Sequence, residues 1–128
     1  MPVVRGKDSR STSTPNAVMT TLASPSLART DDLSMWKVAM TRGQQGPVHR
    51  FDVEQIWTVL AGSPTVEMAG EIIHLVAGDT VSVPADVVRR FTAPDDDVEF
   101  LVCGRGSGLA TPVVDGEAGE SVNPAWIS

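Results

Sequence analysis

Two polar residues interrupt an otherwise apolar alternation between residues 49 and 59. The odd positions of this stretch hold His49, Phe51, Val53, Gln55, Trp57 and Val59, whereas the even positions begin with charged side chains. Strict alternation is typical of a strand with one buried face and one solvated face. His49 and Gln55 are therefore predicted to point into the protein, where a polar group needs a partner.

An inward histidine can do chemistry because the ordinary pKa of imidazole lies near neutrality, which makes it a candidate general base. His49 is a candidate catalytic residue on this ground. The alternative interpretation is a core histidine whose hydrogen bonds are satisfied by the protein. Gln55 has the same two interpretations, a structural hydrogen bond inside the fold or a contact to a bound ligand.

Arg89 is the second candidate catalytic residue, in the stretch "VVRRFTA" (87–93). Alternation places Arg89 and Phe91 on one face of a strand. A buried arginine needs a partner, and a substrate carboxylate or enolate could supply one. In the alternative interpretation Arg89 turns outward or pairs with an acidic residue. The remaining candidates for substrate binding are apolar and would wall a cavity with Gln55: Phe51, Trp57, Phe91, Met40 and Trp36.

Two other reactive side chains carry weaker signals. His74 stands between Ile73 and Leu75 in "EIIHLV" and is predicted to be a surface histidine. Cys103 is the single cysteine, so no internal disulfide can form, and no neighbour in sequence activates its thiol.

Composition narrows the class of protein. The chain has 128 residues, enough for one domain, with 16 acidic and 10 basic side chains. This acidic balance argues against a nucleic-acid partner, which needs a basic surface. No apolar run approaches the roughly 20 residues that span a bilayer, so no membrane partner is expected. The stretch 17–28 is too polar for a typical signal peptide, and a cytoplasmic location is expected.

Short β-rich runs follow one another at regular intervals. Residues 1–16 are polar and aperiodic, and we expect a flexible tail there, with one domain over residues 17–128. The predicted strands cover residues 17–23, 34–40, 49–61, 65–68, 71–76, 80–84, 87–93 and 98–103. This spacing predicts an all-β sandwich or barrel. Trp126 and Ile127, near the C-terminus, are expected to pack back on the body or on a partner chain.

Two of these stretches resemble the paired motifs of the cupin superfamily. Residues 49–62 resemble the first motif, with His49 at its first histidine and Gly62 at its closing glycine. Residues 78–93 resemble the second, with Gly78 and Pro84 in place. The resemblance covers roughly residues 36–103. It implies a single-domain jelly-roll barrel (double-stranded β-helix), commonly a homodimer, with its site inside the barrel.

The same resemblance implies an altered metal site. Standard cupins hold a divalent metal with three histidines and a glutamate. At those positions this chain has His49 but also Phe51, Gln55 and Arg89. Phe51 cannot coordinate a metal, Gln55 is a weak ligand, and Arg89 carries a permanent positive charge. We therefore expect no metal and no other cofactor.

If the barrel closes as the cupin spacing implies, the face with His49 and Gln55 meets the face with Arg89. The expected function is a metal-independent enzyme of the isomerase, cyclase, epimerase or lyase type on a small organic molecule. His49 would move a proton, and Arg89 with Gln55 would hold the developing negative charge. The main alternative is a non-catalytic binding or sensing module, and a metal-dependent dioxygenase is the third. The fold hosts many functions, so all three stay open.

Overall fold

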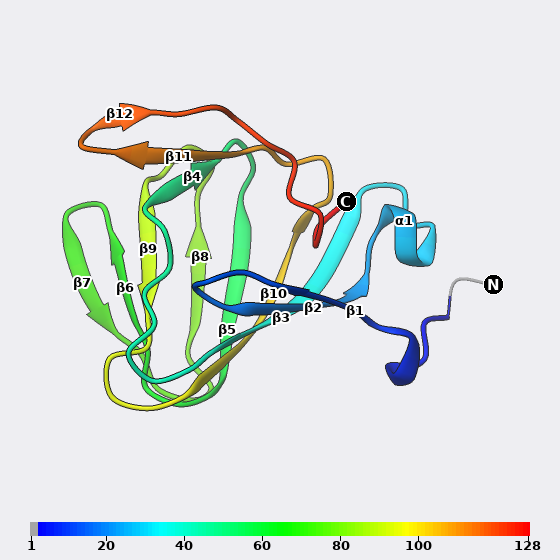
Figure 1. Ribbon diagram of the computed structural model, residues 1–128, viewed down its shortest axis with the longest axis horizontal. Helices are drawn as coiled ribbons and strands as arrows, with labels where there is room; N and C mark the ends of the chain where they lie inside the picture. The colour runs from blue at the N-terminus through cyan, green and yellow to red at the C-terminus, as the bar shows by residue number, and fades with distance from the viewer. Residues whose placement is uncertain (1–2) are drawn as a thin grey trace.

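Two antiparallel sheets of six strands each face one another and enclose the core (Figure 1). The computed structural model describes residues 3–128. The first sheet has the order β1 (Arg10–Ser13), β2 (Val18–Ala23), β3 (Leu33–Met40), β10 (Val98–Arg105), β5 (Gln55–Ala61) and β8 (Thr80–Val83). The second has the order β12 (Glu117–Ala118), β11 (Ala110–Val114), β4 (His49–Phe51), β9 (Arg89–Thr92), β6 (Thr65–Met68) and β7 (Glu71–His74). The expected all-β architecture is confirmed.

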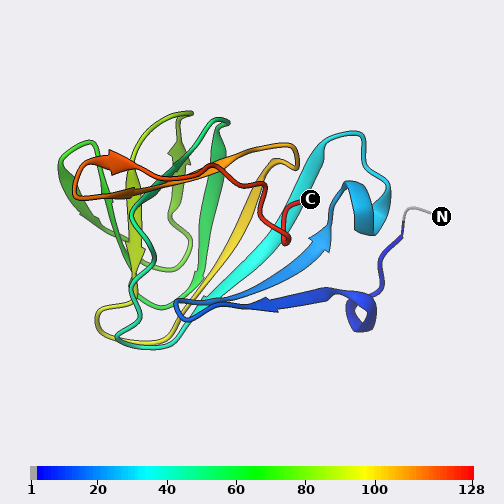
Figure 2. The ribbon, with the colours of Figure 1, turned by 45° about the horizontal axis from the view of Figure 1, so that its top comes forward.

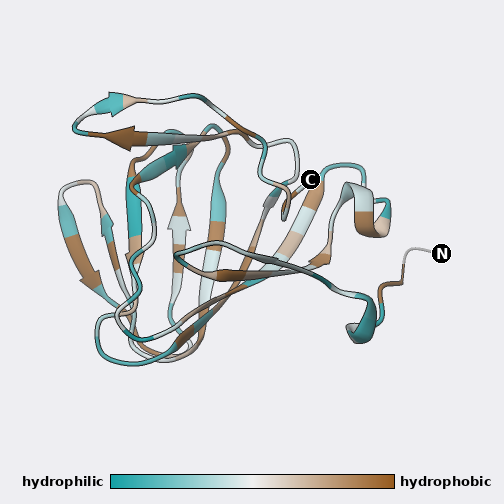
Figure 3. Cartoon of the chain, in the orientation of Figure 1, coloured by the Kyte–Doolittle hydropathy of each residue, from teal (hydrophilic) through white to brown (hydrophobic). Residues whose placement is uncertain are grey.

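Alternation along the central strands builds the core between the sheets. Trp36, Val38 and Met40 of β3 are buried, as the alternation predicted. On β10, next to β3, Phe100 and Val102 are fully buried. The hydropathy of the chain follows the same rule, with apolar and polar segments alternating along the strands (Figure 3). Side chains at alternate positions point to opposite faces, so one apolar set from each strand is enough to fill the interior.

The predicted single strand over residues 49–61 is wrong, because the chain changes sheets in its middle. Residues 49–51 form β4 in the second sheet, and residues 55–61 form β5 in the first. The crossing is held by Asp52, which exchanges two hydrogen bonds with Leu109, one through its backbone N–H and one through its carboxylate. The odd positions still face inward on both sides of the crossing, so His49 and Gln55 reach one interior from two sheets.

The N-terminal part of the chain adds structure that the sequence pattern did not predict. Residues 10–13, which we expected within a flexible tail, form the edge strand β1 against β2. The first two residues of that tail lie outside the described residues. Arg10 donates hydrogen bonds to Ser26 and to the carbonyl of Ala125, which fixes this edge. A short helix, α1 (Pro25–Ala28), and a single 3₁₀ turn, η1 (Gly6–Asp8), complete the elements.

The C-terminal segment packs back on the body beside β3, as expected (Figure 2). Ile127 is fully buried in the core, and Trp126 packs against the core from its edge. The hydroxyl of Thr21 donates to the carbonyl of Trp126 at 2.7 Å, and Ser34 donates to the carbonyl of Ile127. The sheet and the terminal segment therefore share one core.

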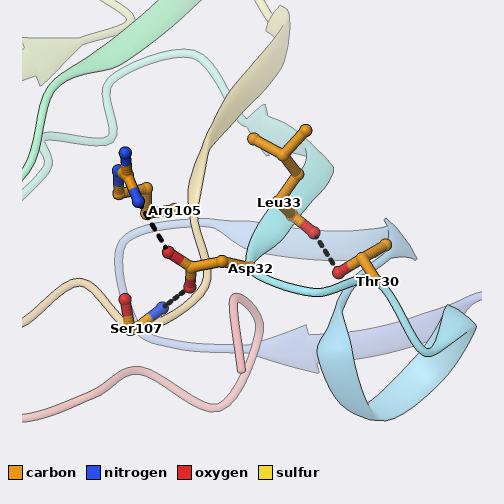
Figure 4. A network of polar contacts seen from close by, with 5 residues as sticks. All are labelled: Thr30, Asp32, Leu33, Arg105 and Ser107. Atoms are coloured by element: carbon orange, nitrogen blue, oxygen red, sulfur yellow. Dashed lines mark hydrogen bonds and ion pairs between the residues drawn. The ribbon is translucent and has the colours of Figure 1, made fainter.

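A polar network ties the start of β3 to the end of β10 (Figure 4). Asp32 accepts hydrogen bonds from the backbone N–H of Ser107 and from Arg105, each at 3.1 Å. The hydrogen bonds from Ser107 are the main cause of the lowered pKa of Asp32. Among residues 3–128, no helix is long and apolar enough to cross a membrane.

Candidate functional site

A cavity of about 290 Å³ lies between the two sheets. Its polar side chains include His49 from β4 and Gln55 from β5. The rest of its inner wall is apolar or aromatic: Trp36, Val38, Met40, Phe51, Trp57 and Phe91. The other lining residues come from the N-terminal segment, the loop before β4, β11 and the C-terminal segment: Thr14, Asn16, Ala17, Met19, Gly46, Pro47, Ala110, Pro112, Val122, Pro124 and Trp126. A largely apolar cavity with a few convergent polar groups is the usual form of a small-molecule site.

His49 enters this cavity as a neutral base with a defined tautomer. Its Nδ1 lies 2.8 Å from the carbonyl oxygen of Pro47. A carbonyl oxygen only accepts hydrogen bonds, so Nδ1 carries the proton and Nε2 keeps the lone pair. Burial, together with the nearby charge of Arg89, lowers the pKa of His49 from 6.5 to about 4. The imidazole is therefore neutral at pH 7 and able to accept a proton at Nε2.

Gln55 is buried, and only the oxygen of its side-chain amide is hydrogen-bonded. Its Oε1 accepts hydrogen bonds from Arg89 Nη2 at 2.7 Å and from the indole Nε1 of Trp57 at 3.1 Å. Both partners are donors, so the contacted atom must be the oxygen and the amide orientation is fixed. The Nε2 of Gln55 is buried without a hydrogen-bond partner among the described residues. A buried donor left in this state costs about 1–3 kcal/mol unless a ligand accepts from it.

Arg89 is turned inward, 1% exposed, and stands opposite His49 in the register of β9 and β4. Its guanidinium carbon lies 4.9 Å from the ring centre of Phe51, an attractive cation–π contact. Two of its nitrogens, Nε and Nη1, have no partner among the described residues, and burial lowers its pKa to about 10. At pH 7 the group is still charged, so a positive charge lies in the interior without a carboxylate beside it.

Arg89 is not among the residues that line the cavity, but its Nη2 binds Gln55, which lines it. Arg89 borders a separate, open groove of about 650 Å³ that is lined by the β6–β7 hairpin and by residues 87–90. Since its Nη2 donates to Gln55, Arg89 lies in the wall between the groove and the cavity. The long side chain of Arg89 reaches from β9 to the amide oxygen of Gln55 on β5, which places the guanidinium behind Gln55.

Aromatic side chains give the cavity one rigid wall. The rings of Trp57 and Phe91 are stacked, with centroids 3.9 Å apart and an angle of 12° between their planes. Phe100 meets both rings edge-on. The indole N–H of Trp57 is bound to Gln55, so this wall and the amide are fixed together.

The donors present do not suit the divalent metal that most cupins hold. No group of three or more His, Cys, Asp or Glu side chains gathers anywhere in residues 3–128. Phe51 offers no ligand, and the one amide oxygen of Gln55 already accepts two hydrogen bonds. The positive charge of Arg89 would repel a cation at this place. The site therefore lacks the ligand set for a first-row metal.

Of the eight predicted site residues, seven line the cavity and Arg89 lies behind it. His74 is exposed, as predicted. The sequence analysis did not predict the cavity-lining residues of the polar N-terminal segment, such as Thr14 and Asn16, or those near the C-terminus, such as Pro112 and Val122. Among these residues only Trp126 was expected to pack on the body, because it is a large apolar residue in a polar segment.

Comparisons with known proteins agree with this architecture. Residues 36–104 match the model of the family described as "Cupin domain". No curated protein sequence matches the chain. Among solved structures, an RmlC-like cupin from Shewanella frigidimarina NCIMB 400 is 21% identical with a TM-score of 0.70, over 80% of this chain and 88% of that one.

Two further solved structures are similar to a comparable degree. KdgF from Halomonas sp. is 23% identical with a TM-score of 0.69, over 80% of this chain and 93% of that one. The DMSP lyase DddQ from Ruegeria pomeroyi DSS-3 is 23% identical with a TM-score of 0.67, over 80% of this chain and 58% of that one. At these identities the likeness is one of fold. The family match spans more than half of the chain, and the two sheets of the chain have the cupin jelly-roll form. The chain therefore belongs to the cupin family.

Proposed function

We propose that this cupin is a metal-independent enzyme that acts on a small, largely apolar molecule by proton transfer inside the barrel. The observation that carries the proposal is the state of His49. Its Nδ1 proton is engaged by Pro47, its Nε2 is unprotonated at neutral pH, and it borders a cavity whose wall is otherwise mostly apolar. A positioned base in a water-poor site is what general base catalysis requires.

The charge of Arg89 supports the same proposal. Negative charge that develops on a substrate after it loses a proton would be stabilised by a fixed positive charge in the wall. The altered donor set argues against chemistry that depends on a bound divalent metal, since the residues at the ligand positions suit an organic substrate better. Isomerisation, cyclisation, epimerisation and elimination can each begin with such a proton transfer.

A non-catalytic binding cupin is the second candidate, and the low pKa of His49 favours it. A base with a pKa of about 4 is a weak proton acceptor, and it removes a proton from carbon only where the resulting anion is strongly stabilised. An apolar cavity with one hydrogen-bond acceptor and one free donor also suits a binding site. The experiment must therefore separate turnover from binding.

Deuterium incorporation provides that test. Chelator-treated protein is incubated in D₂O with a small-molecule extract of its source, and the extract is analysed by mass spectrometry. We expect one or a few compounds to gain deuterium or change their retention with the wild-type protein and not with His49→Gln. His74→Gln, which changes the exposed histidine, is the matched control and should act like the wild type.

Two results would contradict the proposal. If wild-type protein and His49→Gln give the same products, His49 transfers no proton. If compounds bind without any exchange or conversion, the binding cupin is the better description.

A further inference from the structure

The free donor of Gln55 indicates what the cavity binds. The amide is fixed through its oxygen by two donors, Arg89 and Trp57, so its NH₂ group is held in one orientation. The Nε2 atom is buried, unpartnered and part of a residue that borders the cavity. A fixed donor of this kind is matched by a ligand oxygen that only accepts.

The charge pattern of the wall favours a neutral acceptor over a carboxylate. Arg89, the cation of this wall, donates to Gln55 and is not among the cavity-lining residues, so its charge acts on a ligand through Gln55 and not through a direct ion pair. The Nε2 of His49 is unprotonated at neutral pH, and its lone pair would repel a carboxylate oxygen. A carboxylate would lose its hydration and gain only one neutral hydrogen bond, which is unfavourable. A ketone, aldehyde or ester oxygen loses much less.

Arg89 makes the Gln55 amide a stronger donor than an ordinary glutamine. A hydrogen bond from a cation to Oε1 draws electron density from the amide and increases the positive charge on its N–H atoms. The interaction strengthens further when the ligand oxygen becomes negative, because the guanidinium charge is close and poorly screened. The pair therefore favours an enolate oxygen over the parent carbonyl oxygen.

Resting on the proposed function, we propose that the substrate is a neutral carbonyl compound with an acidic α-hydrogen, and that Gln55 Nε2 donates to its carbonyl oxygen. His49 Nε2 takes the proton from the α-carbon. The C–H electron pair becomes the C=C bond of the enolate, and the C=O π pair moves to the oxygen that Gln55 binds. Return of the proton from His49 to either end of the enolate completes the cycle. Arg89 is a positioning residue that acts through Gln55, and the flat wall of Trp57 and Phe91 fits a planar conjugated or aromatic skeleton.

Binding of 2-tetralone, an aromatic ketone with acidic α-hydrogens, tests the inference. Its Kd is compared with those of the hydrocarbon tetralin and the alcohol 2-tetralol, by quenching of tryptophan fluorescence. We expect the ketone to bind about five- to tenfold more tightly than the hydrocarbon, which is the size of one hydrogen bond. The infrared stretch of its carbonyl should move to lower frequency on binding.

Gln55→Glu is the decisive variant, because the new carboxylate can pair with Arg89 and keep the fold while both N–H donors are lost. In this variant the ketone should lose its advantage over the hydrocarbon and its infrared shift, whereas 2-tetralol, which can donate to the carboxylate, should still bind. Arg89→Met is the second variant; it should retain ketone binding with a smaller infrared shift.

The outcomes separate this inference from the proposed function. Equal Kd values for ketone and hydrocarbon, no saturable ketone binding, or an unchanged infrared shift in Gln55→Glu would each overturn the role of Gln55. Deuterium exchange at the α-carbon of bound 2-tetralone, lost in His49→Gln, tests the proton transfer independently. Ketone binding that depends on Gln55 without any exchange would keep the donor role of Gln55 and overturn the proton transfer to His49.

Discussion

At the residue scale, three side chains define the site through their unusual partners. His49 carries its proton on Nδ1, where Pro47 accepts it, so Nε2 is left as a free acceptor. Gln55 is hydrogen-bonded only through its amide oxygen. Arg89 is a buried cation with two nitrogens that have no partner among the described residues. Each arrangement alone would be unfavourable in a folded core. Together they provide an acceptor, a donor and a positive charge beside one apolar cavity.

The lowered pKa of His49 predicts a pH-dependent loss of stability. The unfolded chain has an ordinary histidine pKa near 6.5, whereas the folded value is about 4, so the unfolded state binds more protons between these values. Stability contributed by neutral His49 is complete above about pH 6.5 and is lost as the pH falls toward 4. The loss amounts to at most about 3 kcal/mol.

Urea denaturation of wild type and His49→Gln from pH 8 to pH 4 measures this effect. The difference in unfolding free energy between the two proteins should shift against the wild type as the pH falls through this window. A difference that stays constant with pH would show that His49 has the same pKa in both states.

Arg89→Met should raise the pKa of His49, because it removes the charge that disfavours the imidazolium. The remaining burial still holds the value below 6.5. Arg50→Met, at the neighbouring position of β4, removes an equal charge from the opposite face and serves as the control. The pKa is read from the pH titration of the imidazole signals by NMR. An unchanged or lower pKa in Arg89→Met would exclude coupling between the two groups.

At the element scale, the turn that closes the first motif requires a glycine. Gly62 has a φ of +85°, and a Cβ there would collide with the backbone carbonyl of Asp97 and with Val98. Gly70 has a similar φ of +78°, but nothing lies within 4 Å of its Cβ position. Both Gly→Ala variants place an L side chain in the left-handed region, at a cost of about 1–2 kcal/mol.

Gly62→Ala should therefore be the more destabilising change, by about a further 1–3 kcal/mol of overpacking. Thermal and urea denaturation of Gly62→Ala and Gly70→Ala measure the difference. Equal stability of the two variants would mean that the contact with Asp97 and Val98 relaxes without cost.

Most of the strands could be predicted from alternation, and the exceptions have physical reasons. β1 is rich in Ser and Thr and pairs on one edge only, so it buries little apolar surface and leaves no hydrophobic period. The change of sheet between Phe51 and Gln55 leaves the alternation intact, so the pattern could not reveal it. The place of Arg89 behind Gln55 depends on side-chain reach across sheets, which no pattern along the chain encodes.

At the scale of the whole molecule, the two ends of the chain line part of the cavity between the sheets. Ala17 and Met19 contribute from the N-terminal side, and Pro124 and Trp126 from the C-terminal side. All four lie outside the segment that matches the cupin family model, residues 36–104. The matching segment thus supplies His49 and Gln55, and the terminal segments supply part of the apolar wall.

A homodimer remains a prediction, but we now expect its interface on the outer face of the first sheet and not at the chain termini. Ile127 and Met19 are buried in their own chain, so these terminal residues need no partner. Met35 and Ile56 are instead exposed, 41% and 47%, in register with Cys103 on the outer face of the first sheet. An exposed apolar row of this kind favours self-association.

Light scattering should give twice the chain mass of 13.5 kDa for the wild type, and 13.5 kDa for the double variant Met35→Lys, Ile56→Lys. A control double variant, Ile72→Lys and Val114→Lys, charges two exposed apolar residues of the second sheet and should stay dimeric. A wild-type monomer at micromolar concentration would exclude the dimer.

The ¹⁵N NMR signals of His49 test the central claim most directly, because a free proton acceptor at Nε2 is what the proposed function requires. The chain has two histidines, and His49→Gln identifies which signals belong to His49. From pH 8 to pH 5, we predict a protonated Nδ1 and an unprotonated Nε2, with a titration midpoint of about 4 and no change on adding Zn²⁺. A proton on Nε2, a midpoint near 6.5, or coordination of the added metal would contradict the account.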